Sequence, residues 1–267
     1  MSGAVQIGWN QLALALGFVL LAGGASLWLK LGLGRDLIVG TVRTFAQLFL
    51  MGYVLVYIFA LSRPWLVLVV FAGMIFFAGR IVAGRVKGKG VPVFWPVFLS
   101  MLLSYMVVSF LVTGVVVQAD PWWEPRYFLP LGGMVVGNSM NAMALALERL
   151  FGEMTNRREE VETLLCLGAE PNEATSSIFA DSVRAGMIPS INSMMGVGLV
   201  FIPGMMTGQI LAGADPLLAI KYQIVVMLML VGSTTLGSVL AVSLARRRLF
   251  TPAAQLRPLS PPKPKVH

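Results

Sequence analysis

The sequence predicts an all-α, polytopic integral membrane protein with about seven transmembrane helices. Of its 267 residues, 57% are hydrophobic and only 12% are charged, and the mean hydropathy is +0.81. Soluble globular domains carry about 25% charged residues, so a soluble fold of this size could not bury so much apolar surface. The apolar residues also gather in runs of about 20, the length that a helix needs to cross the hydrocarbon core.

Seven such runs follow one another along the chain. The first is too long for the core of a signal peptide and has no basic region before it, so we expect it to be retained. The third is the shortest, and Arg80 near its end must extend toward the interface. The runs cover residues 9–29, 37–61, 65–83, 93–117, 127–147, 185–214 and 222–245.

The positions of lysine and arginine predict the orientation of these spans. Basic residues gather in the connections 30–36, 84–92 and 148–184 and in the segment that follows the last run, while the alternate connections hold only Arg63, Arg126 and Lys221. Loops rich in Lys and Arg stay in the cytosol. We therefore expect the N-terminus outside and the C-terminus inside, and we attribute the net charge of +8 to these loops and not to a nucleic-acid partner.

We expect two parts, a transmembrane domain, residues 1–250, and a Pro-rich cytosolic tail, residues 251–267. The tail (LRPLSPPKPKVH and the residues before it) has too few apolar residues to form a packed core, so we expect it to be disordered. The surrounding lipid is the only partner that composition alone implies.

Several classes of protein are disfavoured by residues that the chain lacks. One cysteine, Cys166, and one histidine, His267, leave no Cys or His cluster for a metal and no nucleophile–base pair for an intramembrane enzyme. No phosphate-binding loop is present, so the chain needs no cofactor of its own and any ATP hydrolysis belongs to another chain. The spans hold no carboxylate away from their ends, which argues against proton or sodium coupling.

The connection between the fifth and sixth spans is unusually acidic, because it holds eight of the twelve Asp and Glu residues. Asn156, with Glu159 three residues later, predicts a helix start. Gly168 predicts the end of that helix, and Pro171 suits the first turn of a second one. We expect two short helices on the cytosolic face, at about residues 153–186.

The first of these helices is predicted to be amphipathic. Val161, Leu165 and Gly168 recur at helical spacing, and Arg158 and Glu162 flank that stripe. An acidic polar face is repelled by an anionic leaflet, so a protein partner is favoured over a membrane-surface helix or a passive connector. These residues are the candidates for coupling to another polypeptide.

Polar residues within the fifth span form a candidate substrate pathway. Met134, Asn138 and Asn141 fall along one stripe of the helix. Two readings stay open: amides that bind neighbouring helices, or a stripe that faces the substrate.

The sixth span contains a predicted helix break at Pro203 and Gly204, which frees backbone carbonyls near mid-membrane. Broken helices often form binding sites in transporters. The break is followed directly by Met205, Met206 and Gln209. Thioethers bind soft metals and amide oxygens bind harder ones. Methionine also often fills gaps in apolar cores, so a packing role stays open.

Several stretches together resemble one known family. Residues 162–168 (ETLLCLG), followed by Ile188 and Pro189, look like the EAA-type element of ABC permeases, although Thr-Leu replaces the usual Ala-Ala and the interval to Ile-Pro is longer. Residues 137–142 (GNSMNA), 189–194 (PSINSM) and 202–211 (IPGMMTGQIL) resemble the FetB family, over a region from about Val39 to Arg246.

The FetB family comprises permease subunits of bacterial ABC exporters implicated in iron efflux, related to plant aluminium-tolerance permeases. The resemblance implies a multi-pass protein of the bacterial cytoplasmic (inner) membrane that assembles as two permease copies. It also implies a separate FetA-like ATPase that carries ATP and Mg. The alternative that the residues leave open is an ATP-independent secondary carrier or channel for a metal or small solute.

Overall fold

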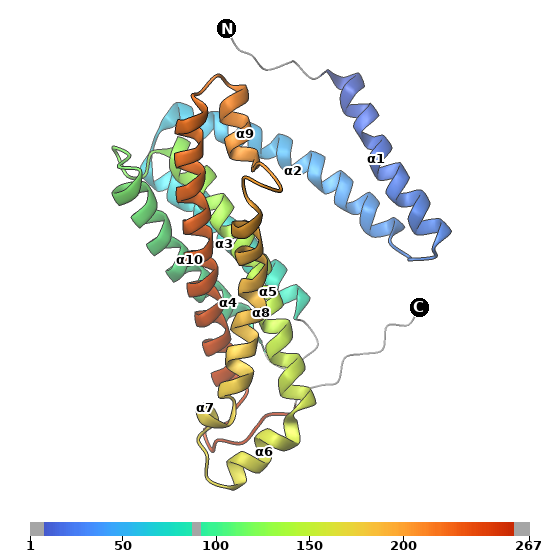
Figure 1. Cartoon of the computed structure of the whole chain (residues 1–267), viewed down its shortest axis with the longest axis vertical. Coiled ribbons are helices and arrows are strands. Elements are labelled where there is room, and N and C mark those ends of the chain that lie inside the picture. The colour runs from blue at the N-terminus through green and yellow to red at the C-terminus, as the bar shows by residue number, and fades with distance from the viewer. Residues whose placement is uncertain (1–7, 87–91, 259–267) are drawn as a thin grey trace.

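The computed structural model describes residues 8–86 and 92–258 and is all-helical there, apart from two isolated bridges. This confirms the predicted all-α class. Five long helices (α3, α4, α5, α8 and α10) lie side by side and the short ones gather at the two ends (Figure 1). The elements are α1 (Trp9–Trp28), α2 (Gly34–Leu61), α3 (Pro64–Arg85), α4 (Phe94–Phe110), the π-helix η1 (Leu111–Val116), α5 (Pro125–Asn156), α6 (Arg158–Cys166), α7 (Pro171–Ala174), α8 (Ser176–Gly196), α9 (Gly204–Leu211) and α10 (Pro216–Arg248).

Five of these elements are long and apolar enough to cross a membrane: α1, α2, α3, the run from α4 through η1, and α10. The chain is therefore a multi-pass membrane protein. Proline occupies the first turn of α3, α5 and α10, where its missing N–H costs no helical hydrogen bond. The side chain of Asp215 caps α10 by accepting a 2.9 Å hydrogen bond from the N–H of Leu218.

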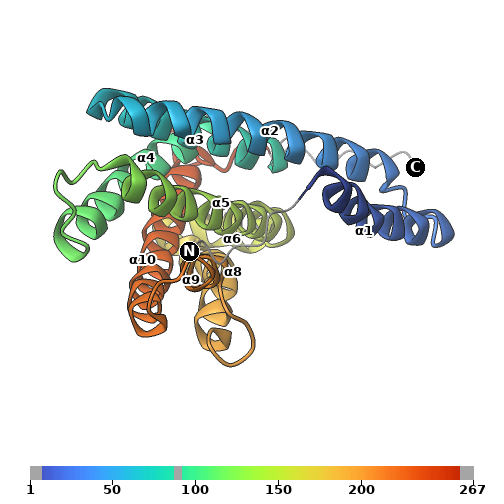
Figure 2. The same ribbon diagram turned by 90° about the horizontal axis from the view of Figure 1, so that it is seen from above.

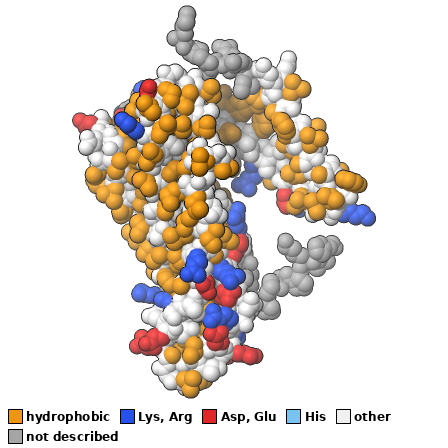
Figure 3. Space-filling view, viewed as in Figure 1, with side chains coloured by type: hydrophobic (Ala, Val, Ile, Leu, Met, Phe, Trp, Pro, Cys, Tyr) orange, Lys and Arg blue, Asp and Glu red, His pale blue; other side chains and the backbone are white. Residues whose placement is uncertain are grey.

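The core of the molecule is a bundle in which α5, α8 and α10 contact one another, while α3 packs on α5 and α4 packs on α10. Aromatic and large apolar side chains fill it, as at Phe71 and Phe128, whose rings meet edge to face with 5.1 Å between their centroids. One end of the bundle carries α6 and α7, and the opposite end carries α9 (Figure 1). We call these the α6 end and the α9 end. Charged side chains gather over the α6 end, and hydrophobic ones cover most of the bundle above it (Figure 3).

Helices α1 and α2 form a hairpin, of which α1 and the first part of α2 project from the bundle (Figures 1 and 2). The last part of α2 crosses the bundle, where Val54, Leu55 and Ile58 pack on the core. Helices α1 and α2 contact each other, and α2 touches α5. Ser26 and Ile58 are their only buried side chains among the described residues. An apolar surface this exposed suits lipid as its surroundings.

The connection between α5 and α8 differs from the prediction. Helix α5 continues without a break to Asn156, which is its last residue, so the predicted cap of the next helix at Asn156 is wrong. Arg157 separates α5 from α6 instead, with φ −106° and ψ 27°. The predicted second short helix is a single turn, α7, and α8 starts directly after it and runs into the bundle as one helix. Both long helices thus extend past the predicted spans at the α6 end.

The start of the predicted tail has a defined place in the structure. After α10, the N–H of Arg257 donates to the carbonyl of Leu249 at 2.8 Å, and the N–H of Thr251 donates to the carbonyl of Gln255 at 2.9 Å. Leu256 is buried in this C-terminal turn, which we define as residues 249–257. The rest of the predicted tail, residues 259–267, lies outside the described residues.

Close helix packing at Gly186 gives a stability prediction. A Cβ atom there would lie 2.8 Å from the carbonyl oxygen of Ala142 and 2.9 Å from the Cβ of Ala146, so α8 approaches α5 only because the residue is glycine. We expect Gly186→Ala to lower the free energy of unfolding by about 1–3 kcal/mol. Thermal unfolding in detergent measures this, with Gly73→Ala on α3 as the control, since nothing lies within 4 Å of a Cβ at Gly73. Equal melting temperatures for the two variants would contradict the packing.

Candidate functional site

The helical run predicted over residues 185–214 is interrupted in the structure. Helix α8 ends at Gly196 and α9 begins at Gly204. Gly198, between them, has a φ of +82°, which other residues rarely adopt. Pro203 has an extended conformation and precedes α9, where its carbonyl accepts the N–H of Thr207 at 3.0 Å. The interruption therefore covers residues 197–203. The predicted break at Pro203 and Gly204 lies at the end of this interruption, where α9 begins.

A cavity of about 410 Å³ lies against this interruption, between α5, α10 and the start of α9. It brings together five of the residues that the sequence singled out: Met134 and Asn138 from α5, and Pro203, Gly204 and Met205 from the break. The remaining lining residues are Ser193, Phe201, Ile202, Gln223, Val226, Met227 and Leu230.

A second, more apolar cavity of about 370 Å³ lies beside the first and shares Ile202, Gln223 and Met227 with it. Met206 lines this second cavity. Gln223 is only 5% exposed, and its Oε1 atom has no hydrogen-bond partner among the described residues. A buried amide oxygen without a partner is costly, so Gln223 is a polar group available to a solute at the boundary of the two cavities.

The sequence patterns did not predict Gln223 as a site residue. It lies at the start of the last predicted span, where a polar residue is ordinary for the membrane interface. Its position opposite the break emerges only when α10 packs beside α9. One feature of the sequence could have indicated its role, because it is the only glutamine in the largely apolar run from 222 to 232.

The amides of α5 are bound to their own helix. Asn138 donates from Nδ2 to the carbonyl of Met134 at 3.0 Å, and Asn141 donates from Nδ2 to the carbonyl of Gly137 at 3.4 Å. Both side chains are exposed, and neither forms a hydrogen bond to another helix among the described residues. Of the two readings that the sequence left open, the structure gives no support to amides that join neighbouring helices.

The other predicted pathway residues lie apart from the first cavity. Asn141 is one turn nearer the α6 end and borders neither cavity. Gln209 lies on α9, with a buried Oε1 atom that has no partner within the described part of the chain. Within residues 8–86 and 92–258, no three His, Cys, Asp or Glu side chains come close enough to share a metal ion. The cavity thus offers amide, hydroxyl, carbonyl and thioether groups.

The α6 end carries the predicted coupling residues. Arg158 and Glu162 form an ion pair on α6, with 2.7 Å between Nη2 and Oε1. Leu165 is half-buried and packs against the core, behind the fully buried Val161. Gly168 ends the helix as predicted, with a φ of +94°. Its N–H donates to the carbonyl of Leu165 at 3.1 Å, and the N–H of Ala169 donates to that of Leu164 at 3.0 Å.

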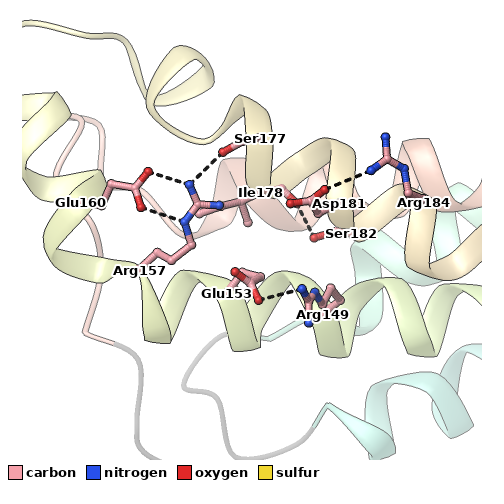
Figure 4. A network of polar contacts seen from close by, with 9 residues as sticks. All are labelled: Arg149, Glu153, Arg157, Glu160, Ser177, Ile178, Asp181, Ser182 and Arg184. Atoms are coloured by element: carbon pink, nitrogen blue, oxygen red, sulfur yellow. Dashed lines mark hydrogen bonds and ion pairs between the residues drawn. The ribbon is translucent and has the colours of Figure 1, made fainter.

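Arg157 joins α5, α6 and α8 (Figure 4). Its guanidinium donates two hydrogen bonds to Glu160, at 2.6 and 2.8 Å, and one to the hydroxyl of Ser177 at 3.1 Å. The hydrogen bond from Arg157 holds the pKa of the Glu160 carboxyl below its usual range, and the same bond raises the pKa of Arg157. The bend between α5 and α6 is therefore tied to the first turn of α8, which leads toward the helix break.

Part of α6 and the residues that follow it are exposed, and Glu162, Leu165 and Cys166 line a shallow hollow beside the C-terminal turn. Thr163, Cys166 and Gly168 are exposed, and Leu167 is 78% exposed at the tip of the helix.

Comparison with known proteins places the chain in a family. The model of the family described as "Uncharacterised protein family (UPF0014)" matches residues 9–250. The UPF0014 membrane protein YjkA of Bacillus subtilis is 36% identical over 247 residues, which are 92% of this chain and 97% of the relative. No solved structure matches the chain.

Two further relatives carry descriptive names. The probable iron export permease protein FetB of Escherichia coli is 34% identical over 248 residues, 92% of this chain and 94% of the relative. Protein ALUMINUM SENSITIVE 3 of Arabidopsis thaliana is 35% identical over 249 residues, 92% of this chain and 88% of the relative. These matches confirm the resemblance to the FetB family. The chain belongs to the UPF0014 family of membrane proteins.

Proposed function

We propose that the chain is the membrane-spanning subunit of an ATP-driven transporter and exports iron or a related metal species across the bacterial cytoplasmic membrane. One observation carries the proposal. Residues 157–175, which hold α6 and α7 and which we call the α6 cap, are acidic and join the two helices, α5 and α8, that lead directly to the cavity beside the helix break. The name of the relative FetB supplies iron and the direction of transport.

Seven crossings, with the N-terminus outside and the C-terminus inside, fit this arrangement. Helix α5 and the run from α8 to α9 lie side by side with α10, which is itself long and apolar enough to span (Figure 1). Counting them with the five apolar spans gives seven. The α6 end carries Arg149, Arg157, Arg158 and the three arginines that end α10, as expected for a cytosolic face.

The α6 cap is the proposed docking surface for a separate, FetA-like ATPase. A movement of α6 caused by the ATPase is transmitted by Arg157, whose side chain forms hydrogen bonds with both Glu160 and Ser177. It thereby reaches α5 and α8 together. Because α8 ends at the break, a shift of α8 relative to α10 changes the shape of the cavity.

Two copies of the chain complete the proposed pathway. Asn138, Asn141 and Glu148 are exposed along one face of α5. Polar side chains at membrane depth are costly when they face lipid and tend to face a partner helix or a water-filled path. A second copy packed over this face would shield the stripe and place a polar path between the two subunits.

Reconstitution tests the proposal. The chain and its partner ATPase, in liposomes that enclose an iron-sensitive dye, are expected to move ferrous iron from the outer solution into the lumen only with ATP and Mg outside, and not with an ATPase that lacks its catalytic glutamate. Sustained movement by the chain alone, driven by an ion gradient, would contradict ATP coupling and favour a secondary carrier. Movement without any energy source would favour a channel.

A further inference from the structure

A third cavity lies at the α6 end, where α10 leaves the bundle. Its volume is about 430 Å³, and Arg247, Arg248 and Arg257 line it together with apolar and hydroxyl side chains. We call it the arginine pocket. Its other lining residues are Pro92, Phe250, Thr251 and Pro252.

The C-terminal turn builds this pocket. Arg257 follows Leu256, which is 8% exposed and anchors the turn in the core. The backbone bond from Arg257 to Leu249 folds the chain back, and the Nε of Arg257 donates to the carbonyl of Phe250 at 3.4 Å. The turn thus holds Arg257 beside the last two residues of α10.

The three arginines have no acidic partner. None of them forms an ion pair among the described residues, and no Asp or Glu lines the pocket. By contrast, Arg149, Arg157, Arg158 and Arg184 are each paired with a carboxylate. All three side chains of the pocket are exposed and line one hollow, so an anion in it can contact more than one guanidinium group.

We infer that the arginine pocket binds a phosphate group. Guanidinium groups match phosphate oxygens with paired hydrogen bonds, and the Thr251 hydroxyl adds another donor. The pocket begins within two residues of the end of the last apolar run, at residue 245, which is the level of lipid headgroups. Basic pockets at the cytosolic ends of transmembrane helices bind anionic headgroups. The phosphate belongs either to such a headgroup or to a free phosphate ion. Only the placement of the pocket on the cytosolic side of the membrane rests on the proposed function.

Binding to the purified full chain in a neutral detergent tests the inference. Native mass spectrometry measures the binding of phosphatidylglycerol, with phosphatidylcholine as the neutral control lipid. The rise in melting temperature measures the binding of inorganic phosphate. We expect the triple variant R247Q/R248Q/R257Q to bind phosphatidylglycerol about a hundredfold more weakly, since each arginine contributes about fivefold. Loss of lipid binding alone assigns an anionic lipid, and loss of phosphate binding as well assigns the phosphate group by itself.

Two further variants separate a built pocket from net charge. The triple variant R63Q/R126Q/K221Q removes the same charge at the α9 end and is expected to bind phosphatidylglycerol as the wild type does. Leu256→Ser keeps every arginine but loosens the C-terminal turn, and we expect about fivefold weaker binding because Arg257 leaves the pocket. Unchanged binding in R247Q/R248Q/R257Q, or equal loss in both triple variants, would overturn the inference. The assay contains neither ATPase nor metal, so its outcome is independent of whether the chain proves to be an ATP-driven exporter.

Discussion

Replacing Gly168 with proline is expected to abolish co-purification of the partner ATPase while the membrane bundle stays folded. The backbone at Gly168 has a φ of +94°, and its N–H donates to Leu165. Proline fixes φ near about −65° and has no N–H, at a cost of about 3 kcal/mol or more, so the tip of α6 with the exposed Leu167 loses its shape. Affinity capture of the tagged chain, with thermal unfolding of the same sample, measures both results.

A matched control exists at the other end of the molecule. Gly213 follows α9 with a φ of +91°, and its N–H donates to Ile210 in the same pattern as Gly168. Gly213→Pro introduces the same local strain away from the α6 cap, so it is expected to keep the ATPase bound. If Gly168→Pro still captured the ATPase, or if Gly213→Pro released it equally, α6 would not be the docking surface.

The double variant Asn138→Leu, Gln223→Leu is expected to reduce ATP-driven metal transport at least about tenfold with the ATPase still associated. These two amides are the largest polar side chains that line the cavity beside the break. Gln223 is buried, and removing a hydrogen-bonding group from a buried polar site costs about 1–3 kcal/mol. Asn138 is exposed but lines the same cavity, so a solute there would lose both contacts. Initial rates of ATP-driven metal accumulation in inverted vesicles measure the loss.

Thr235→Val is the control for the cavity variant. Thr235 lies on α10 but binds the carbonyl of Val231 in its own helix and lines neither cavity, so its replacement is expected to leave transport unchanged. Wild-type rates in the double variant would show that the metal follows a different route, and the exposed face of α5 at Asn141 would be the next candidate.

The sequence predicts helices better than it predicts where they bend. Apolar runs located every long helix, because about 20 apolar residues in succession have one favourable fold in a bilayer. The end of α6 at Gly168 was also predictable, since a glycine after an amphipathic stripe is a local signal. The capping pattern at Asn156 gave a wrong prediction because α5 continues through that residue. The bend lies one residue later, where Arg157 contacts Glu160 and Ser177.

The cavity was predictable only in part. Pro203 and Gly204 signal a broken helix by local chemistry, and the stripe on α5 follows from helical spacing. Which of these side chains meet depends on the packing of α5, α9 and α10, which no single segment encodes. For this reason Met134, Asn138 and Met205 share a cavity, Met206 lines its neighbour, and Gln223 escaped notice. The arginine pocket likewise depends on a turn held by Leu256, within a segment whose composition suggests disorder.

The exposed thiol of Cys166, the only cysteine in the chain, allows the most direct test of the proposal that α6 receives mechanical work from an ATPase in the cytosol. The measurement is the labelling of Cys166 by a membrane-impermeant maleimide in intact spheroplasts and in inverted vesicles, with and without the bound ATPase. We predict no labelling in spheroplasts, full labelling in inverted vesicles stripped of ATPase, and protection when the ATPase is restored. Labelling of Cys166 from outside intact spheroplasts would contradict the account.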